Sequence, residues 1–385
     1  MKSTNADGIH SKHASLGPRI ENCTIISPGD DGIAINGDYD VIIETAGDTV
    51  IIASKRDTEI RPGDTVRSFS TGGVFNFEAV VTGIGQATGD IAALSAVLSG
   101  LDLQNSSLFR GFRQMTLSAP VSAAAGSPVC AVNRKGNGYI VRNNYIGNKR
   151  ARGILIKAGQ GLIEGNTIEW NHMGGIVLAP ELYWMEAGFS RSVRIINNTL
   201  RHCLVNPSIW GTVQAGVITV AAEGDGGFAP AGGHMDIEIS GNRIDSCLGV
   251  NILATSITGL TITGNILSNT HTVSRSHGKN PGVNGDAAVM VINCNDVTLD
   301  GNIVEDFGGD VLLDTINVTG ISGANDGVVE GTVTSIKSPF AVPGPAREKG
   351  ERSVYSITGK RVIRPAAGIH IILDNSLTVK TLYIK

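Results

Sequence analysis

Three aspartates close to the N-terminus are the residues best suited to chemistry. Asp7 lies in the segment Asn5-Ala6-Asp7-Gly8, and Asp30 and Asp31 are adjacent in Gly29-Asp30-Asp31-Gly32. Carboxylates that approach each other repel, so one pKa rises and that group stays protonated as an acid. An acid and a base that flank a bond, with room for water, are the apparatus of an inverting glycosidase. The alternative is that Asp30 and Asp31 cap a turn or bind Ca²⁺.

A recurring asparagine unit indicates how these aspartates are positioned. Successive copies lie 22, 32, 44, 23 and 37 residues apart, so the base period is 22–23 residues. This period, with short β-type patches and no long amphipathic helix, predicts a right-handed parallel β-helix whose asparagines form a ladder. A leucine-rich solenoid would need fixed leucine positions that the chain lacks. The repeated positions are Asn144, Asn166, Asn198, Asn242, Asn265 and Asn302, with Glu21-Asn22-Cys23 as a weaker copy.

The same period applies to the aspartates. Asp7 and Asp30 are 23 residues apart, so we expect them to stack on adjacent coils about 5–7 Å apart. Neighbouring strand residues normally point to opposite faces, so Asp31 can join the pair only where the backbone bends. Gly29 and Gly32 would permit that bend.

The rest of the chain divides into segments of different character, and the predicted fold class is all-β. Residues 1–37 are predicted to form the first coils of the β-helix, residues 38–131 an inserted small β-barrel, and residues 132–336 the continuation of the β-helix. Residues 337–352 are rich in Pro, Gly and charge, which indicates a linker. Residues 353–385 then form a short β module.

That module resembles the C-terminal sorting or anchoring modules of secreted proteins from Bacteroidetes-type bacteria. The resemblance implies a secreted, periplasmic or cell-surface location. Residues 1–20 carry no signal-peptide pattern, so we expect that the chain is truncated, with earlier coils and a signal peptide lost or misannotated.

Composition excludes several classes of function. The net charge of −4 gives no electrostatic basis for binding nucleic acid, and no apolar run is long enough for a membrane span. None of the five cysteines forms a CxxC pair, which makes a zinc site of that type unexpected. Cys203 and Cys247 lie at equivalent repeat positions, where they form either an apolar column or a disulfide.

An aromatic loop is a candidate for binding sugar. Tyr183 and Trp184 lie between Glu181 and Glu186 in one of the longer insertions between repeats. Aromatic rings favour the apolar face of a sugar, although the loop could equally pack on its own coil.

Taken in order, these motifs resemble those of a known family. Asn5–His10 and Gly29–Ile35 look like the paired motifs of polygalacturonase-type β-helix hydrolases. The fuller pattern is closer to glycoside hydrolase family 110, the bacterial α-1,3-galactosidases. It adds Gly17–Cys23, the barrel insertion, Arg152–Lys157 and Tyr183–Glu186, and it spans about residues 3–310.

The resemblance implies exo-cleavage of a terminal α-1,3-linked galactose with inversion and with no metal or other cofactor. Asp7, Asp30 and Asp31 would be the catalytic carboxylates, with Asp30 favoured as the base that activates water. The implied substrate contacts are His10, Arg152 and Lys157, with Glu164, Glu181, Tyr183, Trp184 and Glu186 as further candidates.

Two rival functions remain open. One is a pectin-degrading enzyme, either a polygalacturonase-like hydrolase or a Ca²⁺-dependent lyase that uses a basic residue to remove a proton. The Gly-His-Gly and Arg-Ile-Lys motifs of polygalacturonases are absent, which disfavours the hydrolase. The other is a non-catalytic surface β-helix that binds glycans.

Overall fold

The computed structural model describes residues 2–55, 57–209, 212–270, 283, 285–307 and 311–322, together with four strands near the C-terminus. The chain divides into two compact units, Met1–Val333 and Thr334–Lys385. Apart from one α-helix and two short 3-10 turns, the described elements are strands, so the predicted all-β class is confirmed. No helix in these ranges is long and apolar enough to cross a membrane.

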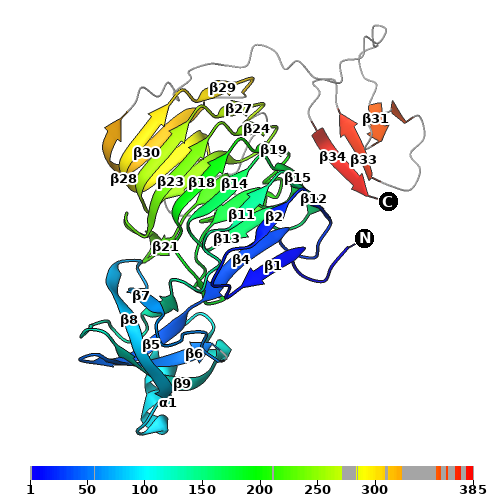
Figure 1. Cartoon of the computed structure of the whole chain (residues 1–385). Helices are drawn as coiled ribbons and strands as arrows, with labels where there is room; N and C mark the ends of the chain where they lie inside the picture. Colours follow the sequence, from blue (N-terminus) through cyan, green and yellow to red (C-terminus); the bar gives the residue numbers. More distant parts are fainter. Residues whose placement is uncertain are drawn as a thin grey trace. The chain divides into compact units, whose positions relative to one another are not determined.

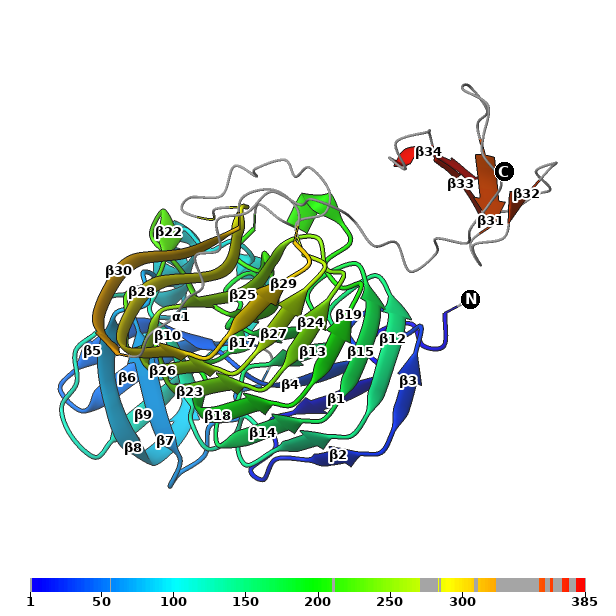
Figure 2. The ribbon, with the colours of Figure 1, turned by 90° about the horizontal axis from the view of Figure 1, so that it is seen from above.

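The first unit contains the predicted parallel β-helix, and its strands form three faces (Figure 1). Successive strands of each face lie side by side from coil to coil (Figure 2). The strand β28 (Ala287–Asp300) runs through both the first and second faces, and β30 (Leu312–Ser322) pairs with it.

The three faces are built from the following strands. The first face comprises β1 (Ile9–Lys12), β4 (Ile33–Asp38), β13 (Ile154–Ile156), β16 (Ile176–Leu178), β20 (Gly216–Val220) and β25 (Val250–Thr255). The second comprises β2 (Arg19–Glu21), β11 (Ile140–Arg142), β14 (Gly161–Glu164), β18 (Arg191–Ile196), β23 (His234–Ser240) and β26 (Ile257–Thr263). The third comprises β3 (Thr24–Ile26), β12 (Tyr145–Lys149), β15 (Thr167–Asn171), β19 (Thr199–Arg201), β24 (Arg243–Asp245), β27 (Ile266–Ser268) and β29 (Ile303–Glu305).

Stacked aliphatic side chains hold the coils together. Parallel pairing places Ile33 beside Ile154, Ile154 beside Ile176, and Ile176 beside Ile218. All four are fully buried in one continuous core. Because each short strand alternates inward and outward residues, the intervening side chains are left on the outer surface of the face. Residues that perform chemistry can therefore occupy that surface.

The predicted asparagine ladder is confirmed. From Asn144 to Asn302, each side-chain amide donates to the side-chain oxygen of the next ladder asparagine at 2.8–3.0 Å. The residue before each ladder position is Asn or Gly with φ between +55° and +63°, a left-handed conformation that these two residue types adopt most easily.

The weaker copy behaves differently. Thr24 pairs with Tyr145, so Cys23 rather than Asn22 occupies the ladder position, and its backbone N–H donates to Asn144 at 2.9 Å. Asn22 instead takes the left-handed turn position, with φ +57°. All five cysteines are free thiols. Cys203 and Cys247 stack in adjacent coils, fully buried, as the predicted column without a disulfide.

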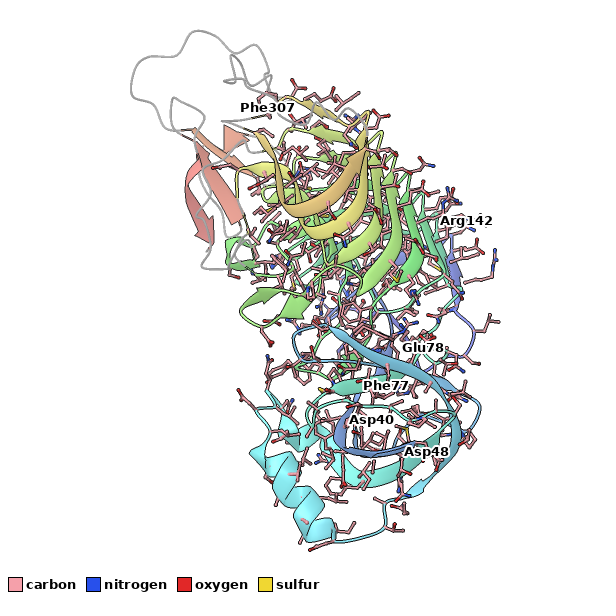
Figure 3. All side chains as sticks on the ribbon, turned by 90° about the vertical axis from the view of Figure 1, so that its left-hand side faces the viewer. Asp40, Asp48, Phe77, Glu78, Arg142 and Phe307 are labelled. Carbon is pink, nitrogen blue, oxygen red and sulfur yellow. The ribbon has the colours of Figure 1, made fainter. Side chains whose placement is uncertain are left out.

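The inserted barrel is confirmed. Six antiparallel strands close in the order β10-β5-β6-β9-β8-β7 between β4 and β11 of the helix. They are β5 (Asp40–Ala46), β6 (Thr49–Lys55), β7 (Thr65–Phe69), β8 (Phe75–Gln86), β9 (Phe109–Leu117) and β10 (Pro128–Ala131). Figure 3 labels Asp40, Asp48, Phe77 and Glu78 in this domain.

Several smaller elements complete the described structure. The helix α1 (Ile91–Gly100) in the barrel was not predicted, although Asp90 caps it by accepting from the backbone N–H groups of Ala92 and Ala93. The other short elements of the first unit are η1 (Ser106–Leu108), β17 (Glu186–Ala187), η2 (Pro207–Ile209), β21 (Glu223–Gly224) and β22 (Gly227–Phe228).

The second unit contains one antiparallel sheet. Its strands are β31 (Ser353–Ser356), β32 (Arg361–Val362), β33 (Ile369–Leu373) and β34 (Val379–Ile384). The predicted linker 337–352 lies outside the described residues.

Replacing a ladder asparagine should destabilise the helix. Asn198 is buried, accepts from the N–H and amide of Asn166, and donates to Asn242. Asn198→Ala leaves these groups without partners, so we expect a loss of about 2–4 kcal/mol in the free energy of unfolding. Urea denaturation followed by circular dichroism measures this loss.

The matched control is Asn197→Gly, at the exposed left-handed position one residue earlier. Glycine tolerates that backbone, so its unfolding free energy should change by less than about 0.5 kcal/mol. Equal losses in both variants would contradict the ladder as a source of stability.

Candidate active site

The aspartates lie in turns that lead into strands of the first face. β1 pairs with β4 in a register that places Ile9 opposite Ile33, and β4 pairs with β13 so that Ile33 is opposite Ile154. Asp7, Asp31 and Arg152 each lie two residues before these isoleucines, so they occupy one column across three coils.

The expected pairing of Asp7 with Asp30 is therefore wrong by one residue. The first coil contains 24 residues rather than 23, and its extra length lies in the turn between β1 and β2, because the interval from β2 to β4 equals that from β11 to β13. Asp7 stacks on Asp31, whose backbone N–H donates to the Asp7 Oδ1 at 3.0 Å. The Gly8 N–H in turn donates to the Asp31 carbonyl at 2.9 Å.

Asp30 nevertheless joins the pair. One carboxylate oxygen of each of the three aspartates lies within 4.8 Å of the others. The bend places Gly29 and Gly32 where a side chain has no room, because a Cβ at Gly29 would lie 2.5 Å from the Asn5 carbonyl oxygen. A Cβ at Gly32 would lie 2.3 Å from the Nζ of Lys149. The bend predicted for these glycines thus brings all three carboxylates together.

Asp31 is the most tightly held of the three. Its carboxylate receives two parallel bonds from the Arg152 guanidinium, Nε to Oδ1 at 2.8 Å and Nη2 to Oδ2 at 2.9 Å. The Arg152 backbone N–H adds a third bond at 2.9 Å. Burial alone would lower the pKa of Arg152, but the charges of Asp31 and Glu181 raise it. This bidentate geometry holds the Asp31 carboxylate in a fixed orientation.

Asp7 and Asp30 have contrasting surroundings. The Nδ1 of His10 lies 3.1 Å from Asp7 Oδ2, and this hydrogen bond raises the pKa of His10. The side chain of Asp30 is 43% exposed, and its nearest cation, Arg150, is 3.5 Å away. Partial burial and the charge of Asp31 raise the pKa of Asp30. Asp30 is therefore the carboxyl of the cluster that is best suited to hold a proton.

A hairpin carries both glutamates to the same place. Glu181 and Glu186 pair with each other, and β17 folds back so that Glu186 lies opposite Asp38 of β4. Glu181 accepts from Arg152 and from Lys157, both at 2.9 Å, and Glu186 accepts from Lys157 at 2.6 Å. Burial opposes ionisation of Glu181, but the charges of Lys157 and Arg152 lower its pKa to about 2.

This network changes the description of two predicted contacts. Lys157 is fully buried, and both of its partners are protein carboxylates. Arg152 is nearly buried and joins Asp31 to Glu181 and to Gln214, whose Oε1 lies 3.2 Å from its Nη1. Both cations tie the hairpin to the aspartates rather than lying on the surface as solvated charges.

The aromatic pair occupies the tip of the hairpin. Tyr183 and Trp184 are about half exposed and meet edge to face, with ring centroids 4.8 Å apart. Below them Met185 is buried in the apolar cluster where the barrel meets the helix. The Nζ of Lys55 from the barrel donates to the carbonyls of Trp184 and Met185. The loop is thus anchored from below while its rings remain accessible.

Several residues at the site were not predicted, and one candidate lies elsewhere. Glu164 is on the second face and lies 3.8 Å from Arg142, which Figure 3 labels. Asn36 points outward from β4, with its Oδ1 2.9 Å from His10 Nε2. Outward alternation from Ala34 would have identified Asn36. Gln214 and Lys149 gave no comparable signal, because tertiary packing alone brings them close.

The three aspartates are also the described residues that could hold a metal ion together. Hard divalent cations such as Ca²⁺ favour carboxylate oxygens, so the donor chemistry is suitable. Both Asp31 oxygens, however, already bind the Arg152 guanidinium. A cation there would have to compete with a bidentate positive group.

Comparison with known proteins agrees with the resemblance that the motifs indicate. No protein-family model matches the chain. The chain is 27% identical over 315 residues to alpha-1,3-galactosidase B of Bacteroides thetaiotaomicron, which covers 80% of this chain and 47% of that protein. The predicted resemblance to the bacterial α-1,3-galactosidases is confirmed. The chain spans about half the length of the curated relative that it matches.

A solved structure, the tailspike protein gp49 of Pseudomonas phage LKA1, aligns with 83% of the chain and 74% of its own length. It shares 9% identity at a TM-score of 0.19, a similarity too low to carry weight. The β-helix of the chain is therefore established by its own strand pairing.

Glu181 should make the stability of the fold depend on pH. Its pKa is lowered from 4.5 to about 2, so its stabilising effect is present above pH 4.5 and disappears as the pH falls toward 2. At pH 7 we expect Glu181→Gln to reduce the free energy of unfolding by up to about 3 kcal/mol. The difference from wild type should vanish near pH 2, as measured by urea unfolding across this range.

Glu44→Gln, at an exposed position on the barrel, is the matched control and should show no such dependence. A Glu181→Gln difference that stays constant between pH 7 and pH 3 would rule out this ionic contribution.

Proposed function

We propose that this chain is a glycoside hydrolase that removes terminal α-1,3-linked galactose from glycans. The observation that carries the proposal is the convergence of Asp7, Asp30 and Asp31 on the outer side of the first face. The similarity to an α-1,3-galactosidase supports the sugar and the linkage. A glycan substrate and the resemblance of the C-terminal module also favour a secreted, periplasmic or cell-surface location.

Asp30 is the proposed general acid. It is the aspartate whose pKa burial and a neighbouring carboxylate raise, and it is open enough to reach a glycosidic oxygen. This reverses the assignment favoured from the sequence, in which Asp30 was the base. A protonated Asp30 donates its proton to the departing oxygen as the bond to galactose breaks.

Asp7 and Asp31 together are the proposed base. Each is fixed by donors: Asp31 by Arg152, and Asp7 by His10 and by the Asp31 N–H. We propose that an ionised pair in this position holds a water molecule and takes its proton as the oxygen attacks the anomeric carbon.

Stereochemistry follows from the same contacts. Oxygens of the carboxylates approach within 4.8 Å, which is shorter than the roughly 6.5–9.5 Å typical between the carboxyl groups of inverting enzymes. Bonds from protein groups to both oxygens of Asp7 and Asp31 reduce their nucleophilicity toward carbon, while each oxygen keeps a second lone pair that can accept a proton from water. These bonds favour activation of water over covalent attack, and hence inversion.

Exo-action is supported by the surroundings of the cluster. The hairpin turns back against the end of β4, and Lys55 of the barrel holds its tip, so protein bounds the first face on that side. A terminal sugar fits such a site better than the interior of a long polymer. We propose that Tyr183 and Trp184 provide the apolar surface against which a sugar ring lies.

A second candidate function is a Ca²⁺-dependent lyase, favoured by the carboxylate cluster alone. The occupation of both Asp31 oxygens by Arg152 weighs against it. A non-catalytic glycan-binding protein would share the exposed aromatic pair but would not turn over any glycoside.

The product anomer tests the proposed reaction. Incubation with galactosyl-α-1,3-galactose should release galactose that first appears as the β anomer in proton NMR spectra. Addition of EDTA should leave the rate unchanged. Appearance of the α anomer first would indicate retention, whereas calcium-dependent cleavage of uronides with unsaturated products would establish the lyase.

Substitution of Asp30 tests its role as the acid. Asp30→Asn should reduce kcat for galactosyl-α-1,3-galactose by roughly 10²–10⁴-fold, because a poor leaving group needs a proton. On 2,4-dinitrophenyl α-galactoside, which leaves without protonation, the loss should be less than about tenfold. Steady-state kinetics on both substrates measure the contrast.

Asp7→Asn is the matched comparison, since loss of the base slows hydrolysis of both substrates. If Asp30→Asn lost activity equally on the two, and azide restored it, Asp30 would be the base instead.

A further inference from the structure

A lysine lies buried directly beneath the aspartate cluster. Lys149, the last residue of β12, is 4% exposed, and its Nζ has no hydrogen-bond partner among the described protein atoms. The ammonium lies against Gly32, since a Cβ at that glycine would be 2.3 Å from Nζ. An unpartnered buried cation is costly, so its presence requires an explanation.

The neighbouring coils show what this position normally contains. Lys149 pairs with Asn171, and continuation of that register places Cys203 next in the column. Each contacts the glycine that precedes a strand of the first face: a Cβ at Gly153 would be 3.0 Å from the side-chain amide of Asn171. The equivalent Cβ at Gly175 would be 3.4 Å from the Cys203 sulfur.

In the column of Lys149, Asn171 and Cys203, the position beneath Asp31 therefore carries a positive charge, whereas the positions in the next two coils are neutral. Packing alone does not require a charge here, because asparagine and cysteine fill equivalent places against equivalent glycines. The difference coincides with the aspartates, since Gly32 follows Asp31 directly in the chain.

We propose that Lys149 is a positioning residue whose buried ammonium balances the charge of Asp7 and Asp31, so that the proton of the cluster resides on Asp30. The inference rests on the proposed function and deepens it. Arg152, His10 and Arg150 act on the cluster from its outer side, whereas Lys149 acts from the interior of the helix. Positive charge on both sides keeps two carboxylates ionised next to a third that is protonated.

The surroundings of the ammonium support this role. Burial lowers the pKa of Lys149 to about 8, while the neighbouring Asp31, Cys203 and Asp7 act in the opposite direction. Asp31 faces the ammonium from the turn before β4, Cys203 from the segment after β19, and Asp7 from the turn before β1. Lys149 is therefore charged at neutral pH, where the cluster would need it.

The test replaces Lys149 by a neutral side chain of similar length. We expect Lys149→Met to keep or increase the melting temperature, because it removes an unpartnered buried charge. Its kcat/KM for galactosyl-α-1,3-galactose should fall at least tenfold at pH 6. The acidic limb of the kcat/KM profile should move up by roughly one pH unit, because carboxylates without the cation protonate more easily.

The matched control is Lys135→Met, which removes another buried lysine, one that donates to the Phe189 carbonyl at 2.9 Å. The titratable groups that act on Lys135 are Cys130, Arg67 and Arg191, none of which belongs to the aspartate cluster, so the acidic limb should not move. Lys149→Gln, which imitates the Asn171 of the next coil, is a second variant and should reproduce the shift.

A lower melting temperature with an unchanged acidic limb would overturn the proposal and make Lys149 purely structural. Failure of both Lys149 variants to fold would lead to the same conclusion. Carboxyl-carbon NMR titration of the aspartates in wild type and Lys149→Met measures the pKa values of these carboxyl groups and does not require enzymatic activity. If wild type hydrolysed no galactoside, that titration would still test Lys149, and the two failures would be distinguishable.

Discussion

The site depends on one register column of the first face. Parallel pairing aligns the residues before β1, β4 and β13, so Asp7, Asp31 and Arg152 lie above one another on three coils. Successive coils of a parallel sheet are about 4.8 Å apart, which is close enough for hydrogen bonds between neighbouring side chains. Two like charges on adjacent coils would repel, and the guanidinium on the third coil offsets that repulsion. The backbone ladder therefore determines the electrostatics of the cluster.

The inserted barrel is part of this arrangement. Asp31 and Arg152 are 121 residues apart in sequence, and the barrel fills most of the interval, yet β4 and β13 remain direct neighbours. An insertion at a turn leaves the coil register intact, because the stacking of β4 on β13 depends only on the strands. The barrel also contributes Lys55, which binds the carbonyls of the aromatic hairpin. It thus adds a second anchor, at the tip, to a loop that Arg152 and Lys157 already hold to the β-helix.

Buried charges at the site are organised for position rather than for stability. Lys157, Glu181, Glu186 and Arg152 form a continuous network that connects the hairpin to Asp31. Replacement of such a network by apolar residues is often neutral or stabilising, so stability alone does not account for it. Its geometric effect is that the hairpin cannot move without breaking bonds to the residue that holds Asp31. The exposed aromatic rings are consequently fixed relative to the carboxylates.

The sequence by itself determined the β-helix, the barrel insertion, the asparagine ladder and the convergence of the three aspartates. Each rests on a local signal: a repeat period, a recurring asparagine, a turn glycine, or a break in the period filled by strand-and-turn segments. Tertiary structure decided that Asp7 stacks on Asp31 rather than on Asp30, because a single extra residue in a turn shifts the register without changing the motif. Tertiary structure alone placed Lys149 beneath Gly32 and completed the Arg152–Glu181–Lys157 network. Side chains far apart in sequence meet there through coil stacking and a folded-back hairpin, and the repeat period does not predict these contacts.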